Sequence, residues 1–189
     1  MNFAAFYQRS IDTPETFWRE EAGKIAWNTP FSQVLDYSRP PFAKWFADGE
    51  LNVTANCLDR HVAAGLGDRV AFYFEGEPGD TRTITYGELT HEVKQAANML
   101  TALGVTAGDR VAIYMDNTWP AVVSIHAASL CGAAIMPVNP QTKADKLGFM
   151  LADSGARALL TDGHLASEFV PALRGLEAAP WIVCSGAIP

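Results

Sequence analysis

The stretch Asp109–Val138 decides the fold. It reads DRVAIYM, then TWPAVVSIHAASLCG after two intervening residues, then AAIMPV. The first and last pieces are apolar runs of strand length, whereas the middle piece is long enough for a helix and ends at Gly132. A strand, a helix and a strand in direct succession predict two parallel strands joined by a right-handed crossover. This unit therefore indicates an α/β fold.

The same alternation continues toward the C-terminus. The pattern predicts a helix over 142–154, a strand in ARALLTD (156–162), a helix over 165–173 and a last strand in PWIVCS (180–185). The strands are almost continuously apolar, which is typical of a parallel sheet that is buried on both faces. We therefore predict a parallel sheet covered by helices on both faces.

Upstream, GDTRTITYGELTHEV (79–93) predicts a turn, a short strand and the start of a helix. Thr85 and Glu88 have the spacing of a capping box, in which the Thr oxygen accepts from the N3 amide and the Glu reaches back. Apolar residues then recur at steps of three and four, which predicts one buried helix face: Leu89, Val93, Ala96, Leu100 and Leu103. Gly104 ends this helix as a left-handed residue. VAFYF (70–74) predicts a further strand, and 56–64 a helix.

Residues 1–55 differ from the rest by their aromatic and proline content and by the lack of a sustained period. One short helix is expected at Pro14–Ala22, with Pro14 at the first helical position. The other large apolar side chains are too many for a free tail: Trp18, Trp27, Phe31, Phe42, Trp45 and Phe46. We therefore predict an aromatic-rich N-terminal extension, 1–55, that wraps over an α/β body, 56–189.

The composition excludes several classes of protein. The chain has 189 residues, 49% of them hydrophobic and 19% charged, with a net charge of -7. The acidic balance argues against a nucleic-acid partner, because phosphate binding needs a basic surface. No run approaches the ~20 apolar residues of a membrane span, and the first ten residues lack the features of a signal peptide. Cys57, Cys131 and Cys184 are scattered, which predicts reduced thiols in a cytoplasmic protein.

Several stretches together resemble the N-terminal part of AMP-forming acetyl-CoA synthetases and their short-chain acyl-CoA relatives. They are PPFAKWFADGELNVTANCLDRHV, GDRVAFYFEGEPGDTRTITYGEL and LGVTAGDRVAIYM. The opening FWREEAGKIAWNTPFSQVLD resembles the N-terminal extension of that branch, and PVNPQTKADKLGFMLADSGARALLTD the general acyl-CoA ligase pattern. The resemblance implies that 56–189 is the first, incomplete α/β subdomain of an adenylate-forming domain, and that TITYGEL begins a core helix.

The resemblance also implies a two-step ligase that uses ATP, Mg²⁺ and coenzyme A (CoA). A short- or medium-chain carboxylate attacks the α-phosphate of ATP to give an acyl-adenylate and pyrophosphate, and the CoA thiol then displaces AMP. Mg²⁺ neutralises phosphate charge in the first step. The expected partners are therefore small molecules, with neither nucleic acid nor membrane among them.

Parts of this machinery are not found in the sequence. The Ser/Thr/Gly loop that cradles phosphate and ends in Pro-Lys-Gly has no counterpart, and no lysine follows Lys146. The Tyr-Gly-x-Thr-Glu segment and the C-terminal domain with its catalytic lysine are also missing. We therefore expect no catalytic residue here, no tightly bound cofactor and no reaction by this chain alone. The alternative is a naturally short, non-catalytic binding or interaction module derived from the same domain.

One candidate site follows from the resemblance. Short-chain members often carry a Gly-Gly-Phe loop after the strand that matches Ile135–Val138, and an Arg-x-x-Arg pair soon after a Thr-x-Asp strand end, and both hold CoA. Here the loop is Asn139-Pro140-Gln141, and TDGHLASEF contains no arginine. Because α/β folds bind ligands at the carboxyl ends of parallel strands, Asn139, Pro140 and Gln141 are the candidate residues on the CoA side.

The four histidines carry no catalytic prediction. His61 and His91 stand beside charged residues on predicted helices and are expected at the surface. His126 lies in an apolar helix and is expected to be partly buried with its polar atoms satisfied. His164 follows a strand end, where it can approach a ligand. No His/Cys/Asp spacing indicates a metal site.

The last strand, 181–183, carries a separate expectation. In the complete family member, later segments cover this subdomain, so the chain by itself is expected to expose a parallel edge and an apolar patch there. Dimers or aggregates of the isolated chain are the predicted consequence. A dinucleotide-binding domain is disfavoured, because Gly104–Gly108 precedes a strand instead of linking a strand to a helix.

Overall fold

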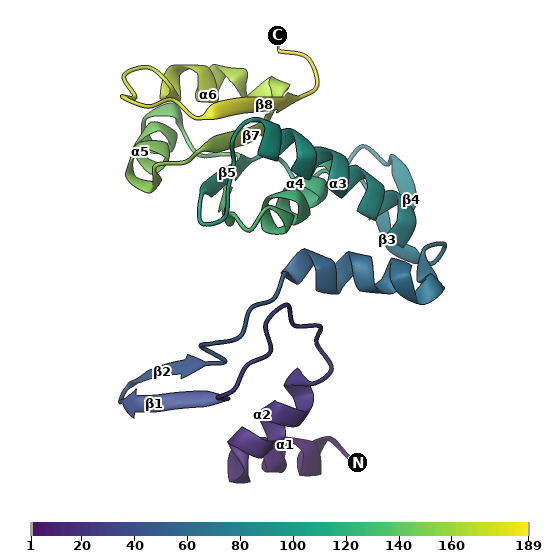
Figure 1. Ribbon diagram of the computed structural model, residues 1–189. Helices are drawn as coiled ribbons and strands as arrows, with labels where there is room; N and C mark the ends of the chain where they lie inside the picture. The colour runs from purple at the N-terminus through teal and green to yellow at the C-terminus, as the bar shows by residue number, and fades with distance from the viewer. Residues whose placement is uncertain (1, 189) are drawn as a thin grey trace. The chain divides into compact units, whose positions relative to one another are not determined.

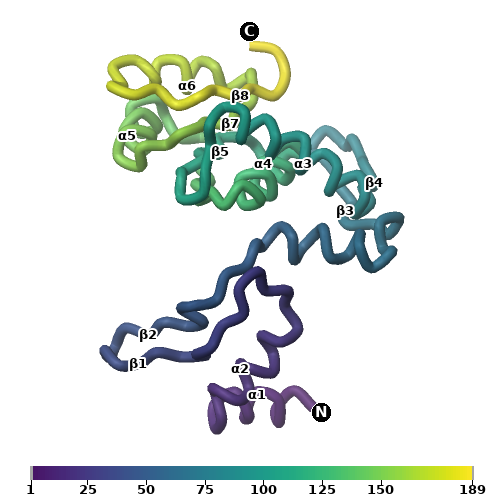
Figure 2. The backbone as a smooth tube through the Cα atoms, viewed as in Figure 1, coloured from purple at the N-terminus to yellow at the C-terminus, as the bar shows by residue number. Residues whose placement is uncertain are grey.

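The computed structural model describes residues 2–188 of the chain, which divides into two units, Met1–Asn56 and Cys57–Pro189. Figure 1 labels the helices and strands of both units, and Figure 2 traces the backbone in the same view. Among residues 2–188, no helix combines the length and the apolar character needed to cross a bilayer.

A four-stranded parallel sheet forms the centre of the second unit, in the order β6-β5-β7-β8. Its strands are β5 (Arg110–Tyr114), β6 (Ala134–Val138), β7 (Ala158–Asp162) and β8 (Trp181–Ser185). β7 is buried along its whole length, and β5 is buried at every residue after Arg110. The predicted α/β fold with a parallel sheet is confirmed.

Helices cover both faces of this sheet (Figure 1). They are α3 (Tyr86–Ala102), α4 (Trp119–Leu130), α5 (Ala144–Ser154) and α6 (Ala166–Ala172). Val111 and Ile113 of β5 pack in one core cluster with α3 and α4, whereas Ala112 and Tyr114 pack in a second cluster with α5 and α6. Alternate residues of a strand point to opposite faces, so each central strand contributes to both clusters. The predicted cover on both faces is therefore confirmed.

The helix α3 begins at the predicted capping box. The Thr85 Oγ1 accepts a hydrogen bond from the Glu88 amide at 3.2 Å, and Glu88 Oε2 accepts one from the Thr85 amide at 2.8 Å. The bonds from Thr85 hold the pKa of the Glu88 carboxyl below its ordinary value. Of the predicted stripe, Val93 and Leu100 are fully buried, and Gly104 follows the helix with a φ of 80°.

An antiparallel hairpin precedes α3 and forms a sheet of its own. It consists of β3 (Val70–Glu75) and β4 (Thr81–Thr85). Arg82 of β4 lies 2.5 Å from Glu92 of α3, and its guanidinium carbon lies 4.6 Å from the ring centre of Trp119 in α4. The Trp119 indole N–H donates to the second oxygen of Glu92. One carboxylate thus joins the hairpin and α4 to α3.

A helical segment with irregular hydrogen bonding joins the two units. It contains two π-helical turns, Ala55–Asp59 and Val62–Leu66, and Gly65 within it has a φ of 78°. The structure therefore has a helical segment where the sequence predicts one over 56–64, but the π turns are not part of that prediction.

The first unit has more regular structure than the sequence predicts. The predicted helix is present as α2 (Pro14–Ala22), but α1 (Phe3–Asp12) precedes it, and β1 (Leu35–Arg39) pairs antiparallel with β2 (Phe42–Trp45). Both additional features lie in the segment that the sequence analysis treats as irregular.

The aromatic residues of this unit pack against one another. The ring centres of Trp27, Phe31 and Phe46 lie 4.7 to 5.6 Å apart, and those of Trp18 and Trp45 lie 6.1 Å apart. Such edge and tilted arrangements are the favourable ones for aromatic pairs. The aromatic-rich extension is therefore confirmed, whereas its wrapping over the α/β body stays a prediction.

Replacing Leu100 by Ala tests how α3 is anchored. The Leu100 side chain is fully buried, so truncation leaves a cavity, and we expect the free energy of unfolding to fall by about 2–5 kcal/mol. Met99→Ala on the same helix is the matched control, because Met99 is 37% exposed and its truncation is expected to cost less than about 1 kcal/mol. Urea unfolding followed by circular dichroism measures both losses. Equal losses would show that this face does not anchor the helix.

Candidate functional site

The carboxyl ends of three neighbouring parallel strands meet at one edge of the sheet. β5 is followed by Asp116 and Asn117, β6 is followed by Asn139–Gln141, and β7 ends at Asp162 with His164 close behind. Because β5 lies between β6 and β7, the residues at its end can reach both neighbours. Open α/β sheets bind their ligands at this edge.

A cavity of about 480 Å³ opens at the ends of β5 and β6, and we call it the strand-end pocket. Asp116, Asn117, Asn139 and Gln141 provide its polar lining, while residues of both strands and of α4 provide apolar lining. Pro140 lines it as well, so the loop that the sequence analysis singles out borders a cavity. The volume lies within the range of small-molecule sites.

A buried tyrosine holds the loop after β6. The Tyr114 hydroxyl lies 2.9 Å from the Pro140 carbonyl oxygen and 2.8 Å from the Thr142 carbonyl oxygen. A phenol has one O–H, so the two carbonyls share one donor. Asn139 closes the turn, because its Oδ1 accepts from the Gln141 amide at 2.8 Å and its carbonyl accepts from the Thr142 amide at 2.9 Å. The loop is thus held by hydrogen bonds within itself and by the Tyr114 hydroxyl, which reaches it from the core.

The anchor of this loop does not titrate near neutral pH. Burial raises the pKa of the Tyr114 phenol above its ordinary value, and the Glu168 carboxylate adds to the shift. The phenol therefore remains protonated and keeps its ability to donate.

Three titratable groups gather at the ends of β5 and β7. His164 Nε2 lies 2.9 Å from Asp116 Oδ2, and the Asp116 amide donates to Asp162 Oδ2 at 3.1 Å. Asp162 is 7% exposed, and loss of solvation raises the pKa of its carboxyl. One possible ligand atom from each residue lies within 4.8 Å of the others, a grouping that sequence spacing does not reveal.

These residues do not fit Mg²⁺. That ion demands near-ideal octahedral geometry, prefers oxygen ligands and keeps several waters. Here an imidazole lies against one oxygen of Asp116, and the almost fully buried carboxylate of Asp162 accepts a backbone N–H. We therefore assign no reaction step to Mg²⁺ at this cluster.

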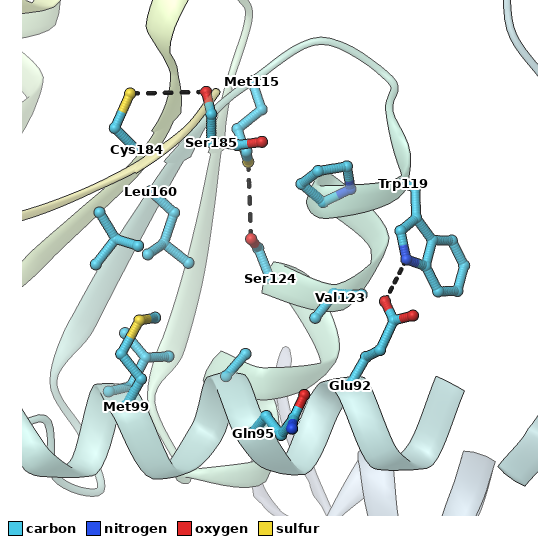
Figure 3. Close-up of a pocket in the computed structure, with 14 residues that line it drawn as sticks. Glu92, Gln95, Met99, Met115, Trp119, Val123, Ser124, Leu160, Cys184 and Ser185 are labelled. Carbon is cyan, nitrogen blue, oxygen red and sulfur yellow. Dashed lines mark hydrogen bonds between the residues drawn. The ribbon is translucent and has the colours of Figure 1, made fainter. Parts of the chain in front are cut away.

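A second cavity, of about 570 Å³, lies between α3, α4 and the end of β8 (Figure 3). Its walls are mainly apolar, and we call it the apolar groove. Two of its polar side chains already have partners, because the Trp119 N–H donates to Glu92 and the Ser124 hydroxyl lies 3.7 Å from the Met115 sulfur (Figure 3). The groove therefore offers apolar packing, whereas the strand-end pocket offers several polar groups on one cavity.

The histidines lie mostly as expected. His126 is half-buried, and burial lowers the pKa of its imidazole. His91 is exposed, whereas the His61 ring lies 5.1 Å from the ring of Tyr86 and is partly covered. His164 is the one that joins the strand ends, because its Nε2 lies 2.9 Å from Asp116 Oδ2.

The sequence predicts a binding loop at Asn139–Gln141 and places His164 at a strand end, but it gives no prediction for the residues after β5. Asn139–Gln141 is a candidate because it follows a strand, but Asp116 and Asn117 follow β5 in the same way. Applying the strand-end rule to every strand would have found them. Tyr114 gives no such signal, because nothing in an apolar run shows that its hydroxyl meets a loop 26 residues further on.

Two family models match consecutive parts of the chain. The model for the acetyl-coenzyme A synthetase N-terminus matches residues 3–57, and the model for AMP-binding enzymes matches residues 59–185, which is more than half of the chain. The chain belongs to the AMP-binding enzyme family. The resemblance that the sequence analysis draws is thereby confirmed.

Curated relatives carry the name acetyl-coenzyme A synthetase. That of Streptomyces avermitilis is 52% identical over 145 residues, which are 77% of this chain and 22% of the relative. That of Mycobacterium tuberculosis H37Rv is 48% identical over 163 residues, 85% of this chain and 25% of the relative. That of Gemmatimonas aurantiaca is 41% identical over 177 residues, which are 93% of this chain and 27% of the relative. The chain thus spans about a quarter of the length of these relatives.

Tyr114→Phe tests the anchor of the loop. The change removes only the hydroxyl, so we expect the free energy of unfolding to fall by about 0.5–1.5 kcal/mol and hydrogen exchange at the Gln141 and Thr142 amides to speed up. Tyr73→Phe is the matched control, since Tyr73 is 81% exposed on β3, and it should change neither quantity. Unchanged exchange at both loop amides in Tyr114→Phe would contradict the anchoring role.

Proposed function

We propose that this chain is the N-terminal part of an AMP-forming acyl-CoA synthetase. The order of the two family matches carries the proposal, because an acetyl-coenzyme A synthetase N-terminus at 3–57 is followed directly by the AMP-binding region at 59–185. The names of the relatives support a short- or medium-chain carboxylic acid as the substrate.

The proposed reaction has two steps. A carboxylate oxygen of the acid attacks the α-phosphorus of ATP, the bond from that phosphorus to the bridging oxygen breaks, and pyrophosphate leaves. The CoA thiol then loses its proton, its sulfur attacks the acyl carbon, and AMP leaves. The partners are ATP, the acid and CoA, with Mg²⁺ as a metal of the complete enzyme; we propose no nucleic-acid or membrane partner.

Within that enzyme, the chain would supply the sheet and part of the CoA side. We propose Asn139, Pro140 and Gln141 as binding residues, and their support is that all three line the strand-end pocket on a loop fixed by Tyr114. We propose no catalytic residue in the chain, because the phosphate-cradling loop has no counterpart in its sequence.

Two coarser proposals complete this assignment. The first is a division into an extension, 1–55, and a subdomain, 56–189, and the meeting of the two family matches between residues 57 and 59 supports it. The second is a cytoplasmic location, which the three free cysteines support.

Pyrophosphate exchange tests the proposed function. The 189-residue chain is expected to give no ATP–pyrophosphate exchange with acetate, propionate or longer acids, whereas the product of a reading frame continuing past codon 189 should give exchange that depends on the acid. With CoA added, that product should form a thioester. A stop codon with no downstream Pro-Lys-Gly loop would favour the short non-catalytic module. Exchange by the 189-residue chain alone would contradict the absence of a phosphate site.

We also propose that the isolated chain self-associates at β8. Among residues 2–188 this strand pairs with β7 on one side only, and Trp181 at its start is 51% exposed. The apolar groove reaches the other end of the same strand, at Val183–Ser185. An unpaired strand edge beside apolar surface favours pairing with a second copy.

Light scattering at high protein concentration tests this self-association. Trp181→Lys places a charge at the edge strand and is expected to shift dimers toward monomer. Phe149→Lys on α5 is the matched control, because Phe149 is also exposed, at 68%, but lies outside the edge, and it should leave the dimers in place. A wild-type chain that stays monomeric would contradict the proposal.

A further inference from the structure

Two carboxylates and one imidazole converge where β5 and β7 end. One possible ligand atom of each of Asp116, Asp162 and His164 lies within 4.8 Å of the other two. β5 and β7 lie side by side in the sheet (Figure 1) and are paired as far as Tyr114 and Thr161, directly before the segments that carry the two aspartates. The sheet therefore fixes the backbone from which both carboxylates project.

Asp162 is a buried carboxylate with little compensation for its charge. Its side chain belongs to a residue that is only 7% exposed. Among residues 2–188, the one hydrogen bond that its carboxylate accepts comes from the Asp116 amide to Oδ2, at 3.1 Å, and no Lys or Arg forms an ion pair with it. Buried charges in proteins are normally paired or coordinate a metal ion. This carboxylate therefore favours a cation at the cluster.

The contact between His164 and Asp116 does not supply that balance. The His164 Nε2 lies 2.9 Å from Asp116 Oδ2, and the two side chains are 58% and 47% exposed, so water screens their attraction and they can separate at little cost. Even a protonated imidazole would leave one negative charge over on the two carboxylates. A divalent cation would neutralise both carboxylates and could also bind a neutral imidazole.

The kinds of ligand and their spacing fit Zn²⁺. This ion binds imidazole nitrogen and carboxylate oxygen at about 2.0–2.2 Å, so two ligand atoms on a tetrahedral zinc ion lie roughly 3.3 Å apart. His164 Nε2 and Asp116 Oδ2 are already 2.9 Å apart, and they need to separate by only about 0.4 Å to reach that spacing. Because both side chains are half-exposed, they have room to adjust around the buried carboxylate of Asp162.

We propose that Asp116, Asp162 and His164 form a zinc site that ties the end of β5 to the end of β7. Asp162 supplies the buried ligand, and the two exposed side chains close on the ion from the solvent side. Three protein ligands leave the fourth tetrahedral position to a water molecule. The site uses neither the loop after β6 nor a phosphate group, so it goes beyond the proposed function and does not depend on it.

Calorimetric titration of the untagged, phosphine-reduced 189-residue chain with Zn²⁺ tests this site. We expect one ion per chain with a dissociation constant in the micromolar range, and a millimolar excess of Mg²⁺ should not displace it. Co²⁺ in place of Zn²⁺ should give the visible bands of a four-coordinate ion without the sulfur-to-metal band that a cysteine ligand adds. Failure to bind Zn²⁺, displacement by Mg²⁺ or a sulfur-to-metal band would overturn the proposal.

Variants assign the binding to the cluster. His164→Gln is expected to weaken Zn²⁺ binding at least about tenfold, because the loss of a partner that merely orients a ligand already costs about 10–100-fold. His91→Gln removes an exposed histidine of α3 and should leave the affinity unchanged. Asp162→Asn keeps the size of the buried side chain and should also weaken binding at least about tenfold, with circular dichroism as the check on its fold. Equal affinities of the wild-type chain and His164→Gln, an exposed change that does not endanger the fold, would overturn the proposal by themselves.

Discussion

The structure depends on the burial of one parallel sheet on both of its faces. β5 and β7 present apolar side chains in both directions, with Val111 and Ile113 on one face and Ala112 and Tyr114 on the other. Each square ångström of apolar surface removed from water contributes roughly 25 cal/mol, so neither face can be left to solvent without loss. A single layer of helices would cover only one face of the sheet and leave the other exposed to water. The helices between successive strands cover both faces. The capping box and the contacts of Glu92 then fix where the upstream helix and hairpin meet this core.

The sequence predicts this part well because its signals are local. A continuous apolar run, a helical period and a Thr–Glu pair at capping distance each depend on neighbours within one element. The first unit lacks such signals. Trp18 and Trp45 meet across 27 positions of sequence, and the pairing of β1 with β2 shows no regular alternation of buried and exposed residues. Contacts of this kind depend on tertiary packing, so the sequence shows that the aromatics are too many for a tail but not how they pair.

Of the candidate site, too, the sequence predicts only the part that depends on local signals. Asn139–Gln141 can be found from sequence because a polar loop directly follows an apolar strand. The residues that lie beside this loop cannot be predicted in the same way, because they depend on the order of the strands in the sheet. Only the placing of β5 between β6 and β7 brings Asp116 to the cavity on one side and to Asp162 and His164 on the other. The sequence is equally compatible with orders that would separate these residues.

Tyr114 connects the core to the candidate site, because its side chain belongs to both. Its ring is fully buried in the cluster beneath α5 and α6, and its hydroxyl meets the loop that borders the pocket. A buried phenol needs a partner for its O–H, and the loop carbonyls need a donor once they turn away from water. The phenol O–H and the loop carbonyls satisfy one another, so the packing that stabilises the sheet also sets the loop conformation. It follows that the geometry of the pocket is inherited from the core: a change in the volume around Tyr114 would move the loop and, through Pro140, the lining of the pocket.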